Sequence, residues 1–330
     1  MLTAGPFTPD NDRPVRMRNA FAVLAVLVVV AVCVACGGSG AGPPPSSGQS
    51  SAVVMPSNRG SSPAASSVLG RHGAAPPAAN ARLPRDVGHL AGALTDATRS
   101  LRSSIRRWTT DGDPSAGPPP QTVQLWALYQ QRIYGFLADH RALAGRTVPR
   151  LPRWLRPEAN ANLGAIHDLL SLVHPVKHPV KFVVASPKPA GVLLRWFKRA
   201  QRRFGVTWRV LASIMYIESK FGRVRSNSYA GAQGPMQFVP ATWRAYGLGG
   251  NVHDPHDAIM GAANYLDSSG APTDYRQAVY SYNPAGAYVN AVLTYADRMR
   301  RDPDAYYEYY AWQVFVRTKH GAKRLSGPGL

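Results

Sequence analysis

The stretch VTWRVLASIMYIES, residues 206–219, is apolar and has the spacing of a buried helix. At that spacing Leu211, Met215 and Glu218 share one face, so a carboxyl group stands where the pattern requires a core side chain. Burial disfavours the charged form of a carboxyl group and raises its pKa toward the range useful to a general acid. Glu218 is therefore expected either to be anchored by partners or to act as a reactive acid.

The ordinary alternative for Glu218 is that it reaches solvent or pairs with a nearby cation. Lys220, Arg223 and Arg225 follow it closely in the sequence. Perturbed carboxyl groups gather at functional sites, but structural ion pairs perturb them too. This helix alone leaves both interpretations open.

The N-terminus resembles a bacterial secretory signal. Three arginines precede an uncharged apolar run over residues 20–35, and Cys36 follows. The run is short for a spanning helix, which needs about 20 residues. Residues 1–36 are therefore predicted to be a signal peptide of the lipoprotein type with Cys36 lipidated, although Cys33 stands where such signals usually carry an aliphatic residue. A redox or metal pair of Cys33 and Cys36 is the weaker alternative, because no further ligands accompany it.

Residues 37–80 consist mostly of Pro, Gly, Ser and Ala. Such a composition cannot bury enough apolar surface to offset chain entropy, so a disordered tether is predicted. Behind a lipid anchor, a tether lets the folded part reach outward from the membrane. The expected location is therefore the cell envelope, at the outer face of the cytoplasmic membrane. No cysteine follows Cys36, so the folded part is expected to lack disulfides.

The formal net charge is +20 and the pI is about 10.4, which suggests a nucleic-acid-binding protein. Predicted export argues against a nucleic-acid partner, and no binding motif of aromatic and basic residues supports one. The basic side chains are expected to form a solvated surface or to attract anionic envelope polymers or lipid head groups.

Apolar residues recur at helical spacing through the rest of the chain, and no stretch alternates convincingly as a strand does. Residues 81–187 are expected to form a helical accessory region that ends in a proline-rich connector, which marks a domain boundary or an interdomain strap. Residues 188–312 are expected to form a helical domain, and residues 313–330 a basic tail. The fold class is therefore predicted to be mainly α.

Glycines and prolines set the predicted helix bounds within residues 188–312. The expected helices cover residues 191–204, 208–218, 240–246, 257–266, 275–282 and 285–300. The aromatic cluster Tyr306, Tyr307, Tyr309, Tyr310 and Trp312 is interpreted as packing rather than as a ligand site.

Three short blocks follow one another in this domain: IES at 217–219, GAQGPMQFVP at 231–240 and YSYN at 280–283. In this order and at these separations they resemble the lytic transglycosylases, and the resemblance covers residues 193–300. It implies a lysozyme-like helical fold and an enzyme that acts on peptidoglycan glycan strands without a cofactor. Protein partners remain unknown.

The resemblance also implies roles for single residues. Glu218 becomes the one catalytic acid and base. The residues implied to bind or orient the glycan are Ser219, Gln233, Met236, Gln237, Tyr265, Tyr282 and Asn283. Pro235 and Ser281 depart from the residues usual in the family, which leaves the subfamily open.

The distribution of acids agrees with a mechanism that uses one carboxyl group. Ordinary glycosidases need two, but the first acid after Glu218 is Asp254. Glu218 would protonate the glycosidic oxygen between N-acetylmuramic acid and N-acetylglucosamine. It would then accept a proton from the 6-hydroxyl, and by the resemblance the product would be a 1,6-anhydro end.

Two alternatives remain open at this stage. The first is a lysozyme-type hydrolase on the same fold, in which Asp254, Asp257 or Asp274 positions water. The second is a non-catalytic lipoprotein that binds the cell wall.

Two further features have ordinary explanations beside functional ones. The run HDPHD at 253–257 has the composition of a metal site, but helix-start chemistry explains its aspartates, so no metal is predicted. Gly231 and Gly234 either let the backbone approach a sugar chain or serve a turn.

Overall fold

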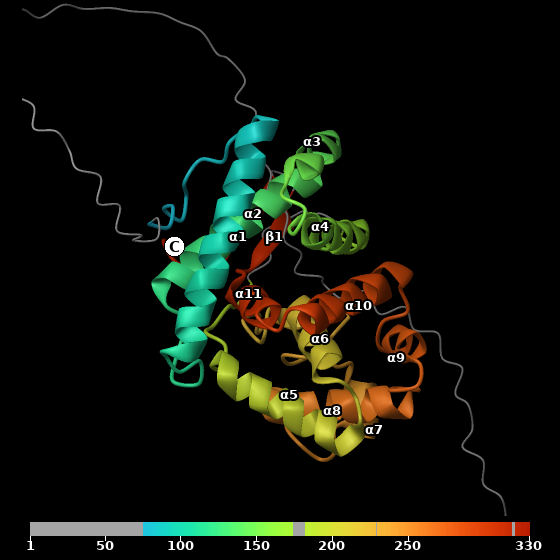
Figure 1. The fold of residues 1–330 in the computed structure, drawn as a ribbon. Coiled ribbons are helices and arrows are strands. Elements are labelled where there is room, and N and C mark those ends of the chain that lie inside the picture. The colour runs from blue at the N-terminus through green and yellow to red at the C-terminus, as the bar shows by residue number, and fades with distance from the viewer. Residues whose placement is uncertain (1–74, 174–181, 229, 319–320) are drawn as a thin grey trace, which may run out of the picture.

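A computed structural model describes residues 75–173, 182–228, 230–318 and 321–330 of this chain (Figure 1). The predicted signal peptide with Cys36, and residues 37–74 of the predicted tether, lie outside the described residues. The fold is mainly α, as predicted. Among the helices described, none is both long and apolar enough to cross a membrane.

The N-terminal part of the described chain forms four α-helices and one 3-10 turn. These are α1 (Val87–Thr110), α2 (Gln121–Asp139), α3 (Arg141–Thr147), η1 (Val148–Arg150) and α4 (Arg156–Ser171). The Asp86 carboxylate accepts a hydrogen bond from the His89 N–H and so caps the first turn of α1. α1 packs on α2 and α2 on α4, so the apolar stripes predicted for this region meet in the core.

The C-terminal part forms seven α-helices. These are α5 (Ala190–Phe204), α6 (Trp208–Ser219), α7 (Pro240–Tyr246), α8 (Pro255–Ser268), α9 (Tyr275–Tyr282), α10 (Gly286–Arg301) and α11 (Ala305–Ala311). The first six lie within two residues of their predicted bounds. Gly205 closes α5 at φ 71°, and Pro240 opens α7, as the sequence predicts.

α6 is the central helix of the molecule, and Figure 1 shows it between α5 and α10. All of its residues except Arg209 are buried. A helix that is apolar all round needs neighbours on every side, and α5, α8, α10 and α11 supply them. The resulting core runs without a break from Leu90 to Trp312. Helices on both sides of the predicted boundary at residue 187 therefore share one core.

The aromatic cluster predicted to be packing is confirmed as packing. Tyr306, Tyr309, Tyr310 and Trp312 are buried, and their rings contact those of Tyr216 and Phe221 on α6 and just after it. Tyr307 is half-buried, and its ring lies 5.4 Å from that of Trp108 on α1. The hydroxyl of Tyr306 donates to the Ala190 carbonyl, which ties α11 to the start of α5.

Residues 313–330, predicted as a basic tail, instead contain an antiparallel hairpin of β1 (Phe315–Thr318) and β2 (Gly321–Arg324). Gln313 anchors it to α2: the Gln313 N–H donates to the Gln131 side chain at 2.8 Å, and the Gln131 amide donates to the Gln313 carbonyl at 3.0 Å. Strands of four residues are too short to give a clear alternation. The glutamine pair that holds the hairpin is polar, so an apolar pattern in the sequence indicates neither the strands nor the pair.

The connector before α5 is pinned to the segment that follows α6. The Ala185 N–H donates to the Arg223 carbonyl and the Arg225 N–H to the Val183 carbonyl, both at 2.9 Å. Val184 and Val224 thereby form an isolated β-bridge. Residues 183–185 act as an extended strap of the kind that the prolines suggest.

A buried ion cluster joins α1, α4, α10 and α11. The Glu158 carboxylate lies 2.6 Å from the Arg102 guanidinium and 3.0 Å from that of Arg298. Glu308 lies 4.0 Å from Arg298, at the edge of an ion pair. Glu158 and Glu308 are 3% and 2% exposed. Two arginines of neighbouring helices thus pair with Glu158. Burial and the charge of Glu158 raise the pKa of Glu308 to about 8.

Replacing Glu158 with Gln is expected to lower the free energy of unfolding by about 3–5 kcal/mol, because it leaves buried arginine charge without its carboxylate. The matched control is Asp297→Asn on α10, whose partners Arg300 and Arg301 are exposed. That change is expected to cost less than about 1 kcal/mol. Urea denaturation of the three proteins measures the difference, and equal losses in the two variants would contradict this role of the cluster.

Candidate functional site

The chain has only three glutamates, and all three are buried. Glu158 and Glu308 belong to the arginine cluster, but Glu218, which is 3% exposed, does not. Its Oε1 accepts a 2.6 Å hydrogen bond from the Tyr288 hydroxyl on α10. Its Oε2 has no hydrogen-bond partner among the described residues. Glu218 is thus the buried glutamate that is bonded to a neutral hydroxyl and stands outside the arginine cluster.

Burial raises the pKa of Glu218 from 4.5 to about 7, although the Tyr288 hydrogen bond and the charge of Lys220 each lower it. Near neutral pH a large fraction of the group therefore carries a proton. A neutral carboxyl group with one unbonded oxygen is suited to donate that proton to a basic atom of a ligand.

The cations after Glu218 do not neutralise it. The described ion pairs within 4 Å include none between Glu218 and Lys220, Arg223 or Arg225. The Lys220 ammonium instead donates to the Tyr216 carbonyl at 3.0 Å and lies 3.9 Å from the centre of the Tyr216 ring. Burial, together with Arg223, lowers the pKa of Lys220 to about 7. The ion-pair interpretation of Glu218 is therefore not supported.

The backbone turns sharply after Glu218. Lys220, Phe221 and Gly222 have φ values of 52°, 60° and 82°, so three consecutive residues are left-handed. The Phe221 N–H donates to the Met215 carbonyl and closes the helix end. Left-handed backbone at non-glycine residues costs about 1–3 kcal/mol each and gathers at functional sites. Here the turn confines the acid to the last turn of α6.

A tight loop at residues 233–238 packs against this helix end. Gln233 and Phe238 exchange two backbone hydrogen bonds of 2.9 Å, and the Met236 side chain between them is fully buried. The Ser219 hydroxyl donates to the Pro235 carbonyl and accepts from the Gly222 N–H, so the residue beside the acid fastens the loop.

Gly234 is required by the turn itself. Its φ is 72°, and a Cβ there would lie 1.9 Å from the Val252 carbonyl oxygen. Gln237 has a φ of 50°, and its side-chain amide donates to the Gly234 carbonyl at 2.8 Å. At Gly234 the turn explanation is therefore sufficient. Gly231 also has a positive φ of 75°, but no atom lies near the place of a Cβ.

Tyr282 bridges the last block to the loop. Its hydroxyl donates to the Met236 carbonyl at 2.6 Å. Burial raises its pKa, and so does the negative charge of Glu218. Its ring lies 5.8 Å from that of Phe238 and 5.7 Å from that of Tyr265.

The remaining predicted residues surround this bridge. The Tyr265 hydroxyl donates to the Ser281 carbonyl at 2.7 Å, and its ring lies 4.7 Å from that of Tyr246. Asn283 is buried directly after α9. The structure thus brings Ser219, Met236, Tyr265 and Tyr282 into one contact network beside Glu218. The roles toward a glycan implied for these residues, for Gln233, Gln237 and Asn283 remain predictions.

Sequence reasoning missed Tyr288, which contacts the acid directly. Tyr288, Val292 and Tyr295 recur at helical spacing on the buried face of α10, so they resemble ordinary core residues. A buried tyrosine hydroxyl needs a polar partner, but Tyr295 shares that requirement, so the sequence alone does not single out Tyr288.

The HDPHD run does gather Asp254, His256 and Asp257, whose ligand atoms lie within 4.8 Å of one another. Asp254 accepts hydrogen bonds from the His256 and Asp257 N–H groups and caps α8. Asp257 accepts from the Asn251 N–H. Helix-start chemistry therefore occupies these carboxylates, as the sequence analysis expected.

Tyr288→Phe is expected to raise the pKa of Glu218 above about 7, because the lost hydrogen bond favours the charged carboxylate. The measurement is NMR titration of the chain labelled with ¹³C-glutamate, in which three glutamates give three carboxyl signals. Tyr280→Phe on the exposed side of α9 is the control and should leave the titration unchanged. An unaltered or lowered pKa in Tyr288→Phe would contradict the role of Tyr288.

The region around Glu218 matches a known family. Residues 195–302 match the family described as "Transglycosylase SLT domain". This interval runs from α5 to just after α10, and so it includes Glu218, the loop at 233–238 and Tyr288.

Two relatives show similarity over a similar length. "Membrane-bound lytic murein transglycosylase F" of Cellvibrio japonicus (strain Ueda107) is 27% identical over 142 residues, which are 38% of this chain and 28% of that protein. "Membrane-bound lytic murein transglycosylase F 1" of Alkalilimnicola ehrlichii is 27% identical over 144 residues, 39% of this chain and 29% of that protein. The chain thus spans less than a third of the length of these relatives. No solved structure matches it significantly. Residues 195–302 of this chain are therefore similar to the transglycosylase SLT domain, and Glu218 lies at the end of the central helix of this region.

Proposed function

We propose that this protein is a peptidoglycan lytic transglycosylase in which Glu218 is the only catalytic acid and base. The observation that carries the proposal is the buried Glu218 carboxyl group, with a pKa of about 7 and one unbonded oxygen, inside the region similar to the SLT domain. Both relatives are named lytic murein transglycosylases. The proposed substrate is the β-1,4 bond between N-acetylmuramic acid and N-acetylglucosamine.

In the proposed reaction, protonated Glu218 donates its proton to the glycosidic oxygen as the bond to the anomeric carbon breaks. The N-acetyl group of the substrate stabilises the positive charge that develops on the sugar. The Glu218 carboxylate then accepts the proton of the 6-hydroxyl of the N-acetylmuramic acid residue. The oxygen of this 6-hydroxyl attacks the anomeric carbon of the same sugar. The 1,6-anhydro ring closes, no water is consumed, and Glu218 is again protonated.

Tyr288 supports both halves of this cycle. Its hydrogen bond to Oε1 fixes the carboxyl group and favours the charged form needed for the second step. Burial favours the neutral form needed for the first. The opposed effects hold the pKa near the pH at which the group must give and regain a proton.

The positions of the other acids support a single-carboxylate mechanism over hydrolysis. Asp254 and Asp274 cap α8 and α9, and Asp257 accepts from the Asn251 N–H. These were the candidates to position water in a lysozyme-type hydrolase. Each of them already has a structural hydrogen bond, so none stands ready as a second catalytic group.

Glu218→Gln is expected to lower cleavage of purified peptidoglycan by about 10²–10⁴-fold, the usual contribution of a general acid. The full chain and the variant are incubated with peptidoglycan, and the soluble products are weighed by mass spectrometry. The expected products have anhydro ends, which are lighter than reducing ends by one water. Reducing ends would identify a hydrolase instead. Release of no product by either protein, with wall binding retained, would identify a binding protein.

We also propose that a lipid on Cys36 anchors the protein to the outer face of the cytoplasmic membrane. The apolar run before Cys36 and the printed names of both relatives, which are called membrane-bound, support this location. Cys36→Ala is expected to move the protein from the membrane fraction to the soluble exported fraction. Cys33→Ala is the matched control and should leave it in the membrane fraction. Equal fractionation of Cys36→Ala and the unaltered chain would reject the anchor.

A further inference from the structure

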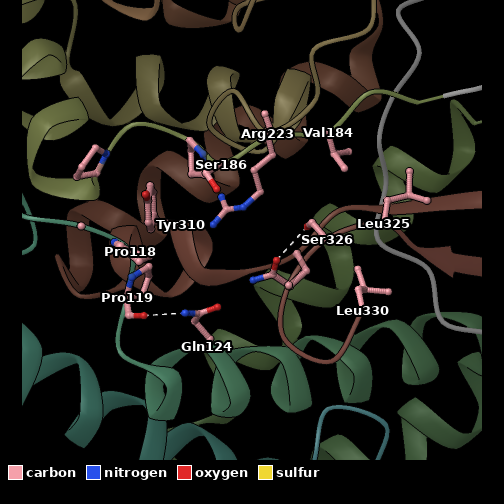
Figure 2. Close-up of a pocket in the computed structure, with 16 residues that line it drawn as sticks. Pro118, Pro119, Gln124, Val184, Ser186, Arg223, Tyr310, Leu325, Ser326 and Leu330 are labelled. Carbon is pink, nitrogen blue, oxygen red and sulfur yellow. Dashed lines mark hydrogen bonds between the residues drawn. The ribbon is translucent and has the colours of Figure 1, made fainter.

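A cavity of about 500 Å³ lies outside the network around Glu218. Five parts of the chain wall it. They are the loop at 117–119 with the start of α2, the strap and connector at 184–189, Arg223, Tyr310 with Gln313, and the segment at 325–330. Figure 2 shows Pro118, Pro119 and Gln124 on one side and Ser326 and Leu330 on another. Its size lies within the range of small-molecule sites, about 300–1,000 Å³.

Arg223 is the only charged side chain that lines this cavity. It is 6% exposed, and Figure 2 shows it reaching toward Ser186 and Tyr310. One of its N–H groups donates to the Lys220 carbonyl at 3.1 Å, and its guanidinium lies 5.0 Å from the centre of the Tyr310 ring. No carboxylate of the described residues forms an ion pair with it. A guanidinium has five N–H donors, and the described residues accept a hydrogen bond from only one of its nitrogens.

A buried cation without a counter-charge is costly, and an anion in the cavity would remove that cost. Burial lowers the pKa of Arg223, which agrees with this imbalance. Apart from Arg223, the side chains of the wall are prolines, aliphatic residues and a few neutral polar groups, and no ion pair joins Arg223 to the terminal carboxylate of Leu330. One cation in such a wall suits a single negative charge on a partly apolar body.

We propose that this cavity binds a small organic carboxylate, whose charged end pairs with Arg223 and whose apolar part lies against Pro118, Pro119 and Leu325. The planar guanidinium can donate two parallel hydrogen bonds to a carboxylate. A phosphate dianion fits less well, because the wall supplies only one positive charge. This proposal does not depend on the proposed function of Glu218.

The test is calorimetric titration of the full chain with N-acetyl-leucine, with its uncharged amide and with inorganic phosphate. The acid is expected to bind about tenfold or more tighter than the amide, since a hydrogen bond to a charged group contributes that much. Equal binding of acid and amide, tighter binding of phosphate, or no binding of the acid would each overturn the proposal.

Two arginines on the same segment locate the site. Arg223→Gln is expected to weaken binding of the acid by about tenfold or more. Arg225 lies two residues after Arg223 and is exposed. Arg225→Gln removes the same charge, and it should change binding of the acid by less than about twofold. Equal losses in both variants would overturn the assignment of Arg223.

A third variant keeps the test decisive if Arg223→Gln does not fold. Ser186 lines the cavity from an exposed position on the connector. Ser186→Trp is therefore expected to obstruct the cavity without removing a buried group, and to weaken binding of the acid by about tenfold or more. Binding that is unchanged in Ser186→Trp places the ligand elsewhere and overturns the proposal.

Discussion

The hydrogen bond from Tyr288 to Glu218 is the interaction on which the proposed chemistry depends. It joins α10 to the end of α6 and gives a buried carboxyl group one partner instead of a counter-ion. Burial raises the pKa of the acid to about 7, and the hydroxyl limits that rise. Glu158 and Glu308 belong instead to the cluster around Arg102 and Arg298. Partner choice, not burial, therefore separates the candidate acid from the two structural glutamates.

The rest of the fold keeps that geometry rigid. α10 packs on α4 as well as on α6, and the ion cluster ties α1, α4, α10 and α11 together at the same interface. The N-terminal helices thus support the helix that carries Tyr288. The loop at 233–238 is held separately. The Ser219 hydroxyl donates to its Pro235 carbonyl, and the Tyr282 hydroxyl on α9 donates to its Met236 carbonyl. The acid is held between two supports that come from distant parts of the sequence.

Much of this arrangement could be predicted from the sequence. Glycines and prolines mark helix ends, so the helices from α5 to α10 were predicted within two residues. The apolar spacing around Glu218 predicted that its carboxyl group is buried. Tyr288 could not be distinguished from core tyrosines such as Tyr295, because its partner lies 70 residues away. The sequence analysis also missed the hairpin after Gln313. Its position is set by hydrogen bonds between Gln131 and Gln313, which are neutral, polar and far apart in the sequence, so the apolar pattern does not indicate them.

The glutamine contacts between α2 and Gln313 also bear on how this chain folds. They join residues 182 positions apart, and Trp312 makes a further bond of the same separation to Gln130. Closing so long a loop is entropically unfavourable until the intervening helices are packed. Early in synthesis, Gln130 and Gln131 on α2 consequently lack the hydrogen bonds that Trp312 and Gln313 later provide. We expect the N-terminal helices to remain only partly assembled until synthesis has passed Gln313, so that a segment made late completes the surroundings of helices made early.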